Sequence, residues 1–359
     1  MCDTKIVKMN RVLALIMTMV IVLVLLAGCG SGGSDKAGQQ KTQEAGKIVA
    51  ENDESITVID QAGREVEVPK GVESIAISYR VVARFVIALG EGEKIKGIGK
   101  TEDFLFQIAP TIQDAVDVGK GVPDLEALAE LDPDIYFHKA TDVDGLDRVE
   151  DLGIPAVGLS FETPEEMKAA LTIMGAVLGK KERAEELTSY YDQRIDEDIQ
   201  EAKAITDKKS AIVMGSSIGK VADGSMLQSN MIEYAGGVSS TADMEATELW
   251  PTAGTEQIFK WDPDFIFITG SEGASYGPND IYNDPAWAEL KAVKDKHVYV
   301  MPAEKDSWEF PGVVSVLGID YMKSKMYPEL LSEEDLQKNI DAFYELSYGR
   351  TFTAEEIGY

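Results

Sequence analysis

Short apolar runs alternate with longer amphipathic segments along most of this chain. Apolar and polar residues also alternate on both sides of a Gly-containing turn at 56–68, which predicts a β-hairpin. Beyond it the predicted strands are 74–78, 95–98, 135–137, 156–159, 211–214, 265–268 and 297–301. The predicted helices are 81–89, 125–130, 164–178, 181–205, 226–234, 256–261, a helix near 287–291, 314–326 and 333–346. Strands that alternate with helices predict βαβ units and a mainly parallel sheet.

One seven-residue phrase occurs twice, 130 residues apart. Its copies are Leu131-Asp132-Pro133-Asp134-Ile135-Tyr136-Phe137 and Trp261-Asp262-Pro263-Asp264-Phe265-Ile266-Phe267. Each copy reads as the end of a short helix, a Pro that stops it and a buried strand. The match extends upstream, because Glu126 and Glu256 each stand seven residues before their Pro. A spacing of about one domain is too long for a solenoid repeat, so we expect two similar α/β lobes.

The N-terminus has the pattern of a targeting segment. Three basic residues precede an almost wholly apolar run at 12–26, and Leu26-Ala27-Gly28-Cys29 follows. That tetrapeptide resembles the bacterial lipobox, in which the Cys is lipidated and becomes the mature N-terminus. We therefore predict a lipoprotein signal peptide at 1–28 and lipidation of Cys29. The alternative is an uncleaved anchor helix, because the apolar run approaches the length that spans a bilayer.

Composition narrows the classes of function. Cleavage after Gly28 removes three positive charges and one negative charge, which takes the net charge from −29 to −31. So acidic a chain is not expected to bind nucleic acid, which requires basic patches. Only Cys29 of the two cysteines would remain, which excludes a disulfide, a zinc site or a Cys nucleophile in the folded part. Residues 29–55 are rich in Gly, Ser, Gln, Lys and Glu, and they predict a flexible tether.

Four motifs, in a fixed order over about residues 56–330, carry a resemblance to a known family. They are Val58-Ile59-Asp60-Gln61-Ala62-Gly63-Arg64-Glu65-Val66, the phrase at 125–134, the phrase at 256–264, and Asn283-Asp284-Pro285-Ala286-Trp287 with 290–294 and Val298-Tyr299. The chain resembles the substrate-binding proteins of ABC importers for siderophore-bound iron, haem and cobalamin. The resemblance implies two α/β lobes joined by one long helix, with the ligand in the cleft between them. We expect an N-terminal lobe at 56–178, a linking helix at 179–206, which is highly charged and exposed, and a C-terminal lobe at 207–359.

Ligands of open α/β sheets bind beyond the carboxyl ends of the strands, which selects a set of candidate residues. The candidates are Tyr79, Arg80, Lys100, Lys120, His138, Ser216, Lys305 and Trp308, with Trp250 added from its place in the family pattern. The cations among them could neutralise an anionic chelate, and the aromatic rings could supply flat apolar contact. His138 directly follows a strand and is a candidate metal ligand. No other metal ligand and no cofactor is expected.

The ligand itself stays open at this level. A ferric siderophore leads, with haem, cobalamin and a molybdate-type oxyanion as alternatives. A different class is also open, because Gly215-Ser216-Ser217-Ile218-Gly219 fits the nucleophile elbow of a serine hydrolase built on Ser217. Against it, Asp223-Gly224 interrupts the helix that an elbow requires, and His297 would have to reach Ser217.

The resemblance also implies partners. In that family a Glu on each lobe docks onto Arg residues of the permease, and Glu126 and Glu256 match these positions. From the residues alone, each Glu lies in the first turn of a short helix, where the helix dipole favours a carboxylate. We expect a monomer, lipid-anchored through Cys29 on the extracytoplasmic face of the cell membrane, that delivers its ligand to an ABC permease dimer with its ATPase.

Overall fold

The computed structural model describes residues 46–100, 103–244, 248–270, 274–303 and 305–358. The predicted signal peptide and Cys29 lie outside this part of the chain. Residues 45–359 form one compact unit. Within the described part, no helix has both the length and the apolar character needed to cross a membrane.

The first described element is a small antiparallel sheet. It has the order β1-β2-β3, with β1 at Lys47–Glu51, β2 at Ser55–Ile59 and β3 at Glu65–Pro69. The last two strands confirm the predicted hairpin. The first strand and Ser55 of the second lie inside the range predicted as a tether, so the prediction that 29–55 is unstructured is wrong for these residues. The apolar residues of the first strand, Ile48, Val49 and Ala50, are mostly exposed, and the strand is held by its pairing with β2.

A five-stranded parallel sheet forms the first lobe, in the order β6-β5-β4-β7-β8. Its strands are β4 (Ile75–Ile77), β5 (Ile95–Ile98), β6 (Val116–Asp117), β7 (Ile135–Lys139) and β8 (Ala156–Leu159). Its helices are α3 (Val81–Ala88), α4 (Asp103–Ile108), α5 (Leu125–Leu131), α6 (Val143–Glu150) and α7 (Pro164–Val177), with short 3₁₀ turns at Gly92–Lys94 and Pro110–Asp114. Strands β4, β7 and β8 are buried on both faces, which explains their mainly apolar sequences.

A four-stranded parallel sheet forms the second lobe, in the order β10-β9-β11-β12. Its strands are β9 (Ser210–Met214), β10 (Val238–Ser239), β11 (Phe265–Ile268) and β12 (Val298–Val300). Its helices are α9 (Leu227–Tyr234), α10 (Thr255–Trp261), α11 (Pro278–Asn283), α12 (Lys291–Lys294) and α13 (Ser315–Met326). The predicted fold class is confirmed, whereas the helix predicted near 287–291 begins only at Lys291, after a series of turns.

The doubled phrase makes the same structure in both lobes. Helices α5 and α10 both end at an Asp in the left-handed conformation, Asp132 with φ 47° and Asp262 with φ 41°. Two residues later, Asp134 accepts hydrogen bonds from two backbone N–H groups just before β4, at 2.8 and 2.9 Å. Asp264 accepts from the N–H and hydroxyl of Ser210 at the start of β9, at 2.9 and 2.8 Å. In each copy the second Asp therefore fixes the beginning of a neighbouring parallel strand.

Helix α8 (Lys181–Ala204) packs against α7 of the first lobe and against α9 and α13 of the second. Its 24 residues extend over roughly 36 Å. The sequence predicted an exposed helix, but Ala184, Leu187 and Tyr191 form a buried stripe on it. Most charged side chains of this helix lie off the buried stripe, although Asp198 is buried as well and pairs with Lys323 of α13 at 2.6 Å.

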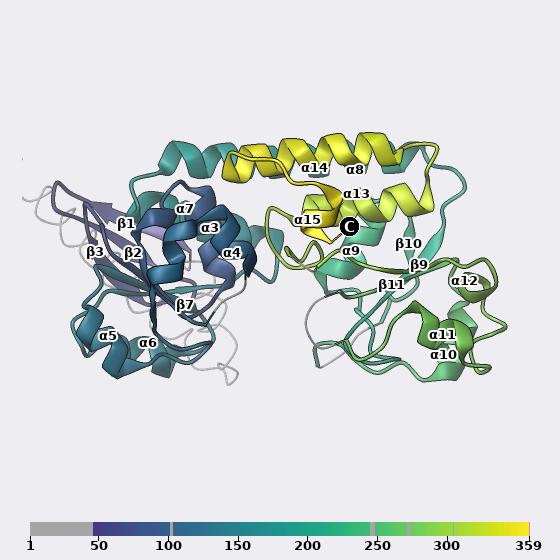
Figure 1. Cartoon of the computed structure of the whole chain (residues 1–359), viewed down its shortest axis with the longest axis horizontal. Helices are drawn as coiled ribbons and strands as arrows, with labels where there is room; N and C mark the ends of the chain where they lie inside the picture. The colour runs from purple at the N-terminus through teal and green to yellow at the C-terminus, as the bar shows by residue number, and fades with distance from the viewer. Residues whose placement is uncertain (1–45, 101–102, 245–247, 271–273, 304, 359) are drawn as a thin grey trace, which may run out of the picture. The chain divides into compact units, whose positions relative to one another are not determined.

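The C-terminal segment returns to the first lobe. Helix α14 (Glu333–Tyr348) lies beside α8 (Figure 1), where the rings of Phe343 and Tyr190 are 6.5 Å apart, and it also contacts α3. Beyond it, Arg350 donates a hydrogen bond to the Gln107 carbonyl at 3.0 Å, just before the last helix, α15 (Ala354–Ile357). The range predicted as the C-terminal lobe therefore contains a segment that packs on both lobes.

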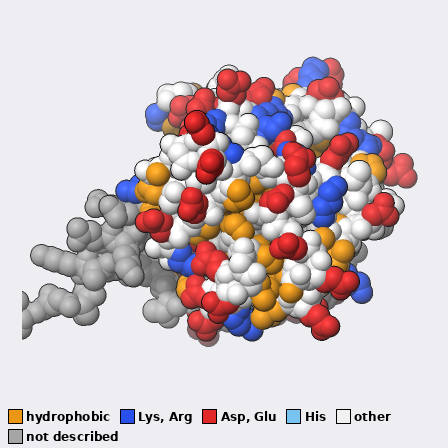
Figure 2. All heavy atoms as spheres, turned by 90° about the vertical axis from the view of Figure 1, so that its left-hand side faces the viewer, with side chains coloured by type: hydrophobic (Ala, Val, Ile, Leu, Met, Phe, Trp, Pro, Cys, Tyr) orange, Lys and Arg blue, Asp and Glu red, His pale blue; other side chains and the backbone are white. Residues whose placement is uncertain are grey.

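Acidic side chains are a visible feature of the surface. Figure 2 shows Asp and Glu side chains spread over one face of the molecule, with Lys and Arg side chains between them. The excess negative charge is thus distributed over this face rather than gathered in one patch, an arrangement that favours solubility.

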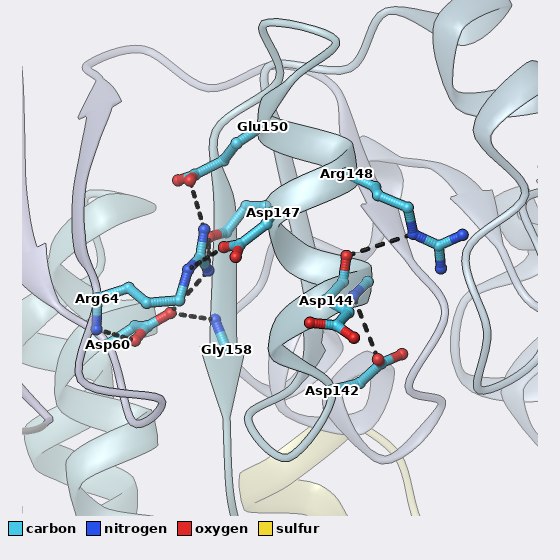
Figure 3. A network of polar contacts seen from close by, with 10 residues as sticks. Asp60, Arg64, Asp142, Asp144, Asp147, Arg148, Glu150 and Gly158 are labelled. Carbon is cyan, nitrogen blue, oxygen red and sulfur yellow. Dashed lines mark hydrogen bonds and ion pairs between the residues drawn. The ribbon is translucent and has the colours of Figure 1, made fainter.

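A buried ionic contact fixes the hairpin to the first lobe (Figure 3). Arg64 follows the turn of the hairpin and pairs with Asp60 at 3.1 Å, Asp147 at 3.1 Å and Glu150 at 2.5 Å. Asp60 is fully buried and also accepts a hydrogen bond from the Gly158 N–H at 2.9 Å. The Asp-Gln-Ala-Gly-Arg motif of the sequence therefore connects the hairpin to α6 and β8.

Candidate functional site

A cavity of about 660 Å³ is lined by residues from both lobes. From the first lobe, Tyr79 follows β4 and Phe161 follows β8; from the second, Ser216 follows β9 and Thr269 follows β11. The remaining lining residues are Val81, Glu162, Thr163, Ser217, Lys220, Ser225, Met226, Leu227, Gln228, Leu249, Trp250, Glu309, Phe310 and Pro311. The carboxyl ends of parallel strands therefore meet at this cavity, as ligand sites in α/β proteins do. Its volume lies within the usual range for small-molecule sites.

Aromatic rings form much of the wall. The rings of Tyr79 and Phe161 lie 6.1 Å apart, and Phe161 stacks on Phe85 at 4.5 Å, so this part of the wall is fixed from behind. Burial, together with the nearby Glu162 and Glu166 carboxylates, raises the pKa of Tyr79 to about 12. Tyr79 therefore keeps its proton at neutral pH and can donate a hydrogen bond to a ligand.

The polar groups of the cavity are mostly hydroxyls and carboxylates. Ser216 and Ser217 are exposed on its second-lobe side, and the buried Glu309 lies on the same side. On the first-lobe side, burial and the Glu166 carboxylate raise the pKa of Glu162. Among the described residues that line the cavity, Lys220 is the only Lys or Arg. The cavity therefore offers one positive charge, several hydroxyls and two carboxyl groups.

Three residues of the predicted site line this cavity, namely Tyr79, Ser216 and Trp250. The four predicted cations do not: Arg80 and Lys305 are half-buried, Lys100 and Lys120 are exposed, and none of them lines it. Arg80 is the N-cap residue of α3 and stands between Tyr79 and Val81, which both line the cavity. Lys100 and Lys120 follow β5 and β6, which form the edge of the sheet beyond β4.

Two further predicted ligand residues are buried in the core. His138 is fully buried, with its Nδ1 2.6 Å from the Ser78 hydroxyl and its Nε2 2.8 Å from an Asp142 oxygen. Burial lowers the pKa of His138, so the ring is neutral and both of its nitrogens are already used. Trp308 is also fully buried, and its indole N–H donates to the Tyr344 hydroxyl at 3.1 Å. Neither of these two predicted ligand residues lines the cavity, and both side chains are part of the core.

Sequence reasoning missed several lining residues. Phe161, Glu162 and Thr163 directly follow β8, so the strand-end rule that selected Tyr79 also applies to them. Thr163 is also the N-cap of α7, where it forms a capping box with Glu166. Lys220 follows the Gly-Ser-Ser loop, of which Ser216 was the residue selected as a candidate for ligand binding.

The geometry excludes a hydrolase built on Ser217. The chain after Gly219 forms β-bridges at Lys220 and Val221 instead of the helix that a nucleophile elbow needs. His297 lies just before β12, with its Nδ1 3.2 Å from the Asp264 carbonyl. His297 therefore lies at the amino ends of the parallel strands, whereas Ser217 follows the carboxyl end of β9. The two residues are at opposite ends of the strands. No proton relay from His297 to Ser217 is therefore possible.

Comparison with known proteins agrees with this description. The family model described as "Periplasmic binding protein" matches residues 75–305, more than half of the chain. The chain is 22% identical over 335 residues to the molybdate-binding protein MolA of Haemophilus influenzae, covering 86% of this chain and 92% of that one. It is 23% identical over 316 residues to the Fe(3+)-citrate-binding protein YfmC of Bacillus subtilis, covering 85% and 94%.

A solved structure of a solute-binding protein is also similar to this chain. The periplasmic solute binding protein from Veillonella parvula superimposes with a TM-score of 0.73 at 27% identity, over 84% of this chain and 95% of that one. The chain belongs to the periplasmic binding protein family, and it is a solute receptor of an ABC transporter rather than an enzyme.

Proposed function

We propose that this receptor captures a metal chelate, with a ferric siderophore as the leading ligand, and delivers it as a monomer to an ABC permease. The observation that carries the proposal is the lining of the cavity. Its volume of about 660 Å³ is bounded by the rings of Tyr79, Phe161, Trp250 and Phe310, with hydroxyls between them. A metal wrapped by an organic chelator presents flat apolar faces and peripheral oxygens, which match rings and hydroxyls respectively.

A molybdate-type oxyanion is the second candidate, because one relative of similar coverage is named as molybdate-binding. Such an ion is small and presents only oxygen, so it would use hydrogen-bond donors and leave the rings without a partner. Two carboxyl groups and a single Lys in the lining also oppose a free dianion. Haem and cobalamin remain alternatives, although the buried His138 is not available as an axial ligand.

The first experiment identifies the ligand class. The metal content and absorbance spectrum of the purified full chain show what co-purifies with it. Fluorescence titration with ferric citrate, with the uncharged ferric hydroxamate ferrichrome and with molybdate then compares the candidates. We expect chelates to quench Trp emission and W250F to remove most of that quenching. Binding of molybdate without binding of either chelate would contradict the proposal.

Glu126 and Glu256 are proposed to contact the permease. Both are exposed and lie in the first turn of α5 and α10, at equivalent places in the two lobes. Reversal of both charges with E126K/E256K is expected to abolish uptake while ligand affinity is unchanged. E130K is a matched control, because Glu130 is exposed on α5 as well but lies at its other end. Uptake by the double variant at the parent rate would refute the docking role.

Lipidation of Cys29 is proposed as the means of membrane attachment. A C29A variant cannot receive the lipid, so it is expected to appear in the medium or the periplasm while the parent stays in the membrane fraction. Cell fractionation followed by immunoblotting measures this directly. Retention of the variant in the membrane fraction would instead support the uncleaved anchor helix.

A further inference from the structure

The loop from Gly215 to Lys220 forms part of the cavity wall and is closed by its own backbone. The Gly215 N–H donates to the Lys220 carbonyl at 2.8 Å, and the Lys220 N–H donates to the Ser217 carbonyl at 3.0 Å. From outside, the Ala253 N–H donates to the Gly219 carbonyl at 2.7 Å. These bonds fix the positions of Ser217 and Lys220 before any ligand arrives, and such preorganisation lowers the cost of binding.

The indole of Trp250 lies directly on this loop. A Cβ atom added to Gly215 would stand 2.7 Å from Trp250 Cε3, so the ring occupies the space that any side chain at this position would need. Trp250 also has a left-handed backbone, with φ 54°, which is rare for a residue of its size. Strained backbone of this kind is concentrated at ligand sites. The loop and the ring therefore make one continuous wall with an aromatic part and a polar part.

The polar part contains a weakly held positive charge. The Lys220 ammonium lies 3.5 Å from an oxygen of Glu248, whereas charged N–H···O bonds are usually about 2.7–2.9 Å long. The side chains of Lys220 and Glu248 are 34% and 65% exposed, and ion pairs with that exposure contribute little stability. A ligand oxygen could therefore replace Glu248 at small cost. The hydroxyls of Ser216 and Ser217 line the same side of the cavity.

The other charges of the cavity restrict where an anionic group can lie. Glu162 and Glu309 are the carboxyl-bearing residues among the described lining, and Glu162 in its ionised form would repel an ionised ligand oxygen. Lys220 is the only cation in the same set. Among the described lining residues, an anionic ligand group therefore meets a positive charge only on the wall formed by the 215–220 loop.

We infer that Lys220, with Ser216 and Ser217, binds an anionic oxygen group of the ligand, and that Glu248 is the counter-ion which this group displaces. The inference rests on the proposed function, because it assigns one end of the bound chelate. It has a consequence that a purely structural ion pair does not share. Removal of the positive partner weakens binding, whereas removal of the negative partner strengthens it, because the ligand no longer competes with Glu248.

The test compares K220Q and E248Q in the full chain by isothermal titration with ferric citrate, an anionic chelate. We expect K220Q to weaken binding roughly tenfold, the value of one charge-assisted hydrogen bond. We expect E248Q to tighten binding roughly threefold, since it removes an exposed competing ion pair. The affinity for uncharged ferrichrome should be the same in both variants as in the parent. K260Q is the control for loss of a positive charge, because Lys260 is exposed on α10 and does not line the cavity.

Two results would refute the inferred role of Lys220 while leaving the proposed function, capture of a chelate, unaffected. One is chelate binding that both variants leave unchanged, and the other is a change of the same sign in both variants. Another result would support the role of Lys220 and contradict the proposal that the ligand is a chelate. If molybdate alone binds, more weakly to K220Q and more tightly to E248Q, then Lys220 is the anion site and the chelate proposal is wrong.

Discussion

Replacement of Trp308 by Phe should lower stability and leave ligand affinity unchanged. The Trp308 side chain is fully buried, and its N–H donates to the Tyr344 hydroxyl, which is buried as well. The smaller ring loses about 1 kcal/mol of buried apolar contact. Loss of the donor to a buried hydroxyl adds about 1–2 kcal/mol. The free energy of unfolding should therefore fall by about 2–3 kcal/mol, a large part of the 5–15 kcal/mol typical of folded domains.

The matched substitution is W250F, because Trp250 lines the cavity and Trp308 does not. Urea denaturation should show little change for W250F, as is usual for a partly exposed side chain, and a clear loss for W308F. Titration calorimetry with the bound chelate should show the reverse order. Calorimetry is preferable to fluorescence here, since both substitutions change the emission of the protein.

A loss of ligand affinity in W308F, with its denaturation midpoint and slope at the parent values, would refute a purely structural role for Trp308. That outcome would support the prediction from the sequence that Trp308, which follows a strand, contacts the ligand. A loss of stability in W250F as large as that in W308F would likewise contradict the division between cavity wall and core.

Three further predictions concern the framework. Lys323 and Asp198 form a buried pair at 2.6 Å, so K323M should lower the free energy of unfolding by about 3–5 kcal/mol in urea denaturation, and K323M/D198L should recover most of it. Hydrogen bonds from two Lys side chains lower the pKa of Glu51 from 4.5 to about 2, so their stabilisation is present above pH 4.5 and is lost as the pH falls toward 2. The melting temperature of the parent should thus fall more steeply than that of E51Q between about pH 5 and pH 3. D134A and D264A should each cost about 1–3 kcal/mol in urea denaturation, because both carboxylates hold the start of a strand.

The sequence predicted the elements of the sheets well because their patterns are local. The strand predicted at 95–98 is β5, and the helix predicted at 164–178 differs from α7 by one residue at its end. The order of the strands is not local. Lys100 seemed equivalent to Tyr79 because each follows a strand, yet β5 lies farther toward the edge than β4. The strand-end rule therefore finds the correct end of the strands, but it does not show which of the loops at that end line the cavity.

The burial of polar side chains such as His138 could not be predicted from the sequence either. His138 follows three apolar residues of β7 and looks like a residue that leaves the core. It stays inside because β7 lies between β4 and β8 and because Ser78 and Asp142 supply partners for both ring nitrogens. Those partners come from positions 60 residues before and 4 residues after His138, and only the folded sheet brings the first of them close.

The doubled phrase separates what the fold requires from what it does not. Its Asp-Pro-Asp part has a structural explanation in both lobes, since Asp134 and Asp264 each hold a neighbouring strand. Its Glu does not need the same explanation. The start of α5 is capped by the Asp124 side chain and the start of α10 by no side chain at all, although a Glu occupies both first turns. A carboxylate there is worth only about 0.3–1 kcal/mol at an exposed helix end. Because the local need differs while the residue is the same, a partner that contacts both lobes accounts for the pair of Glu residues better than helix stability does.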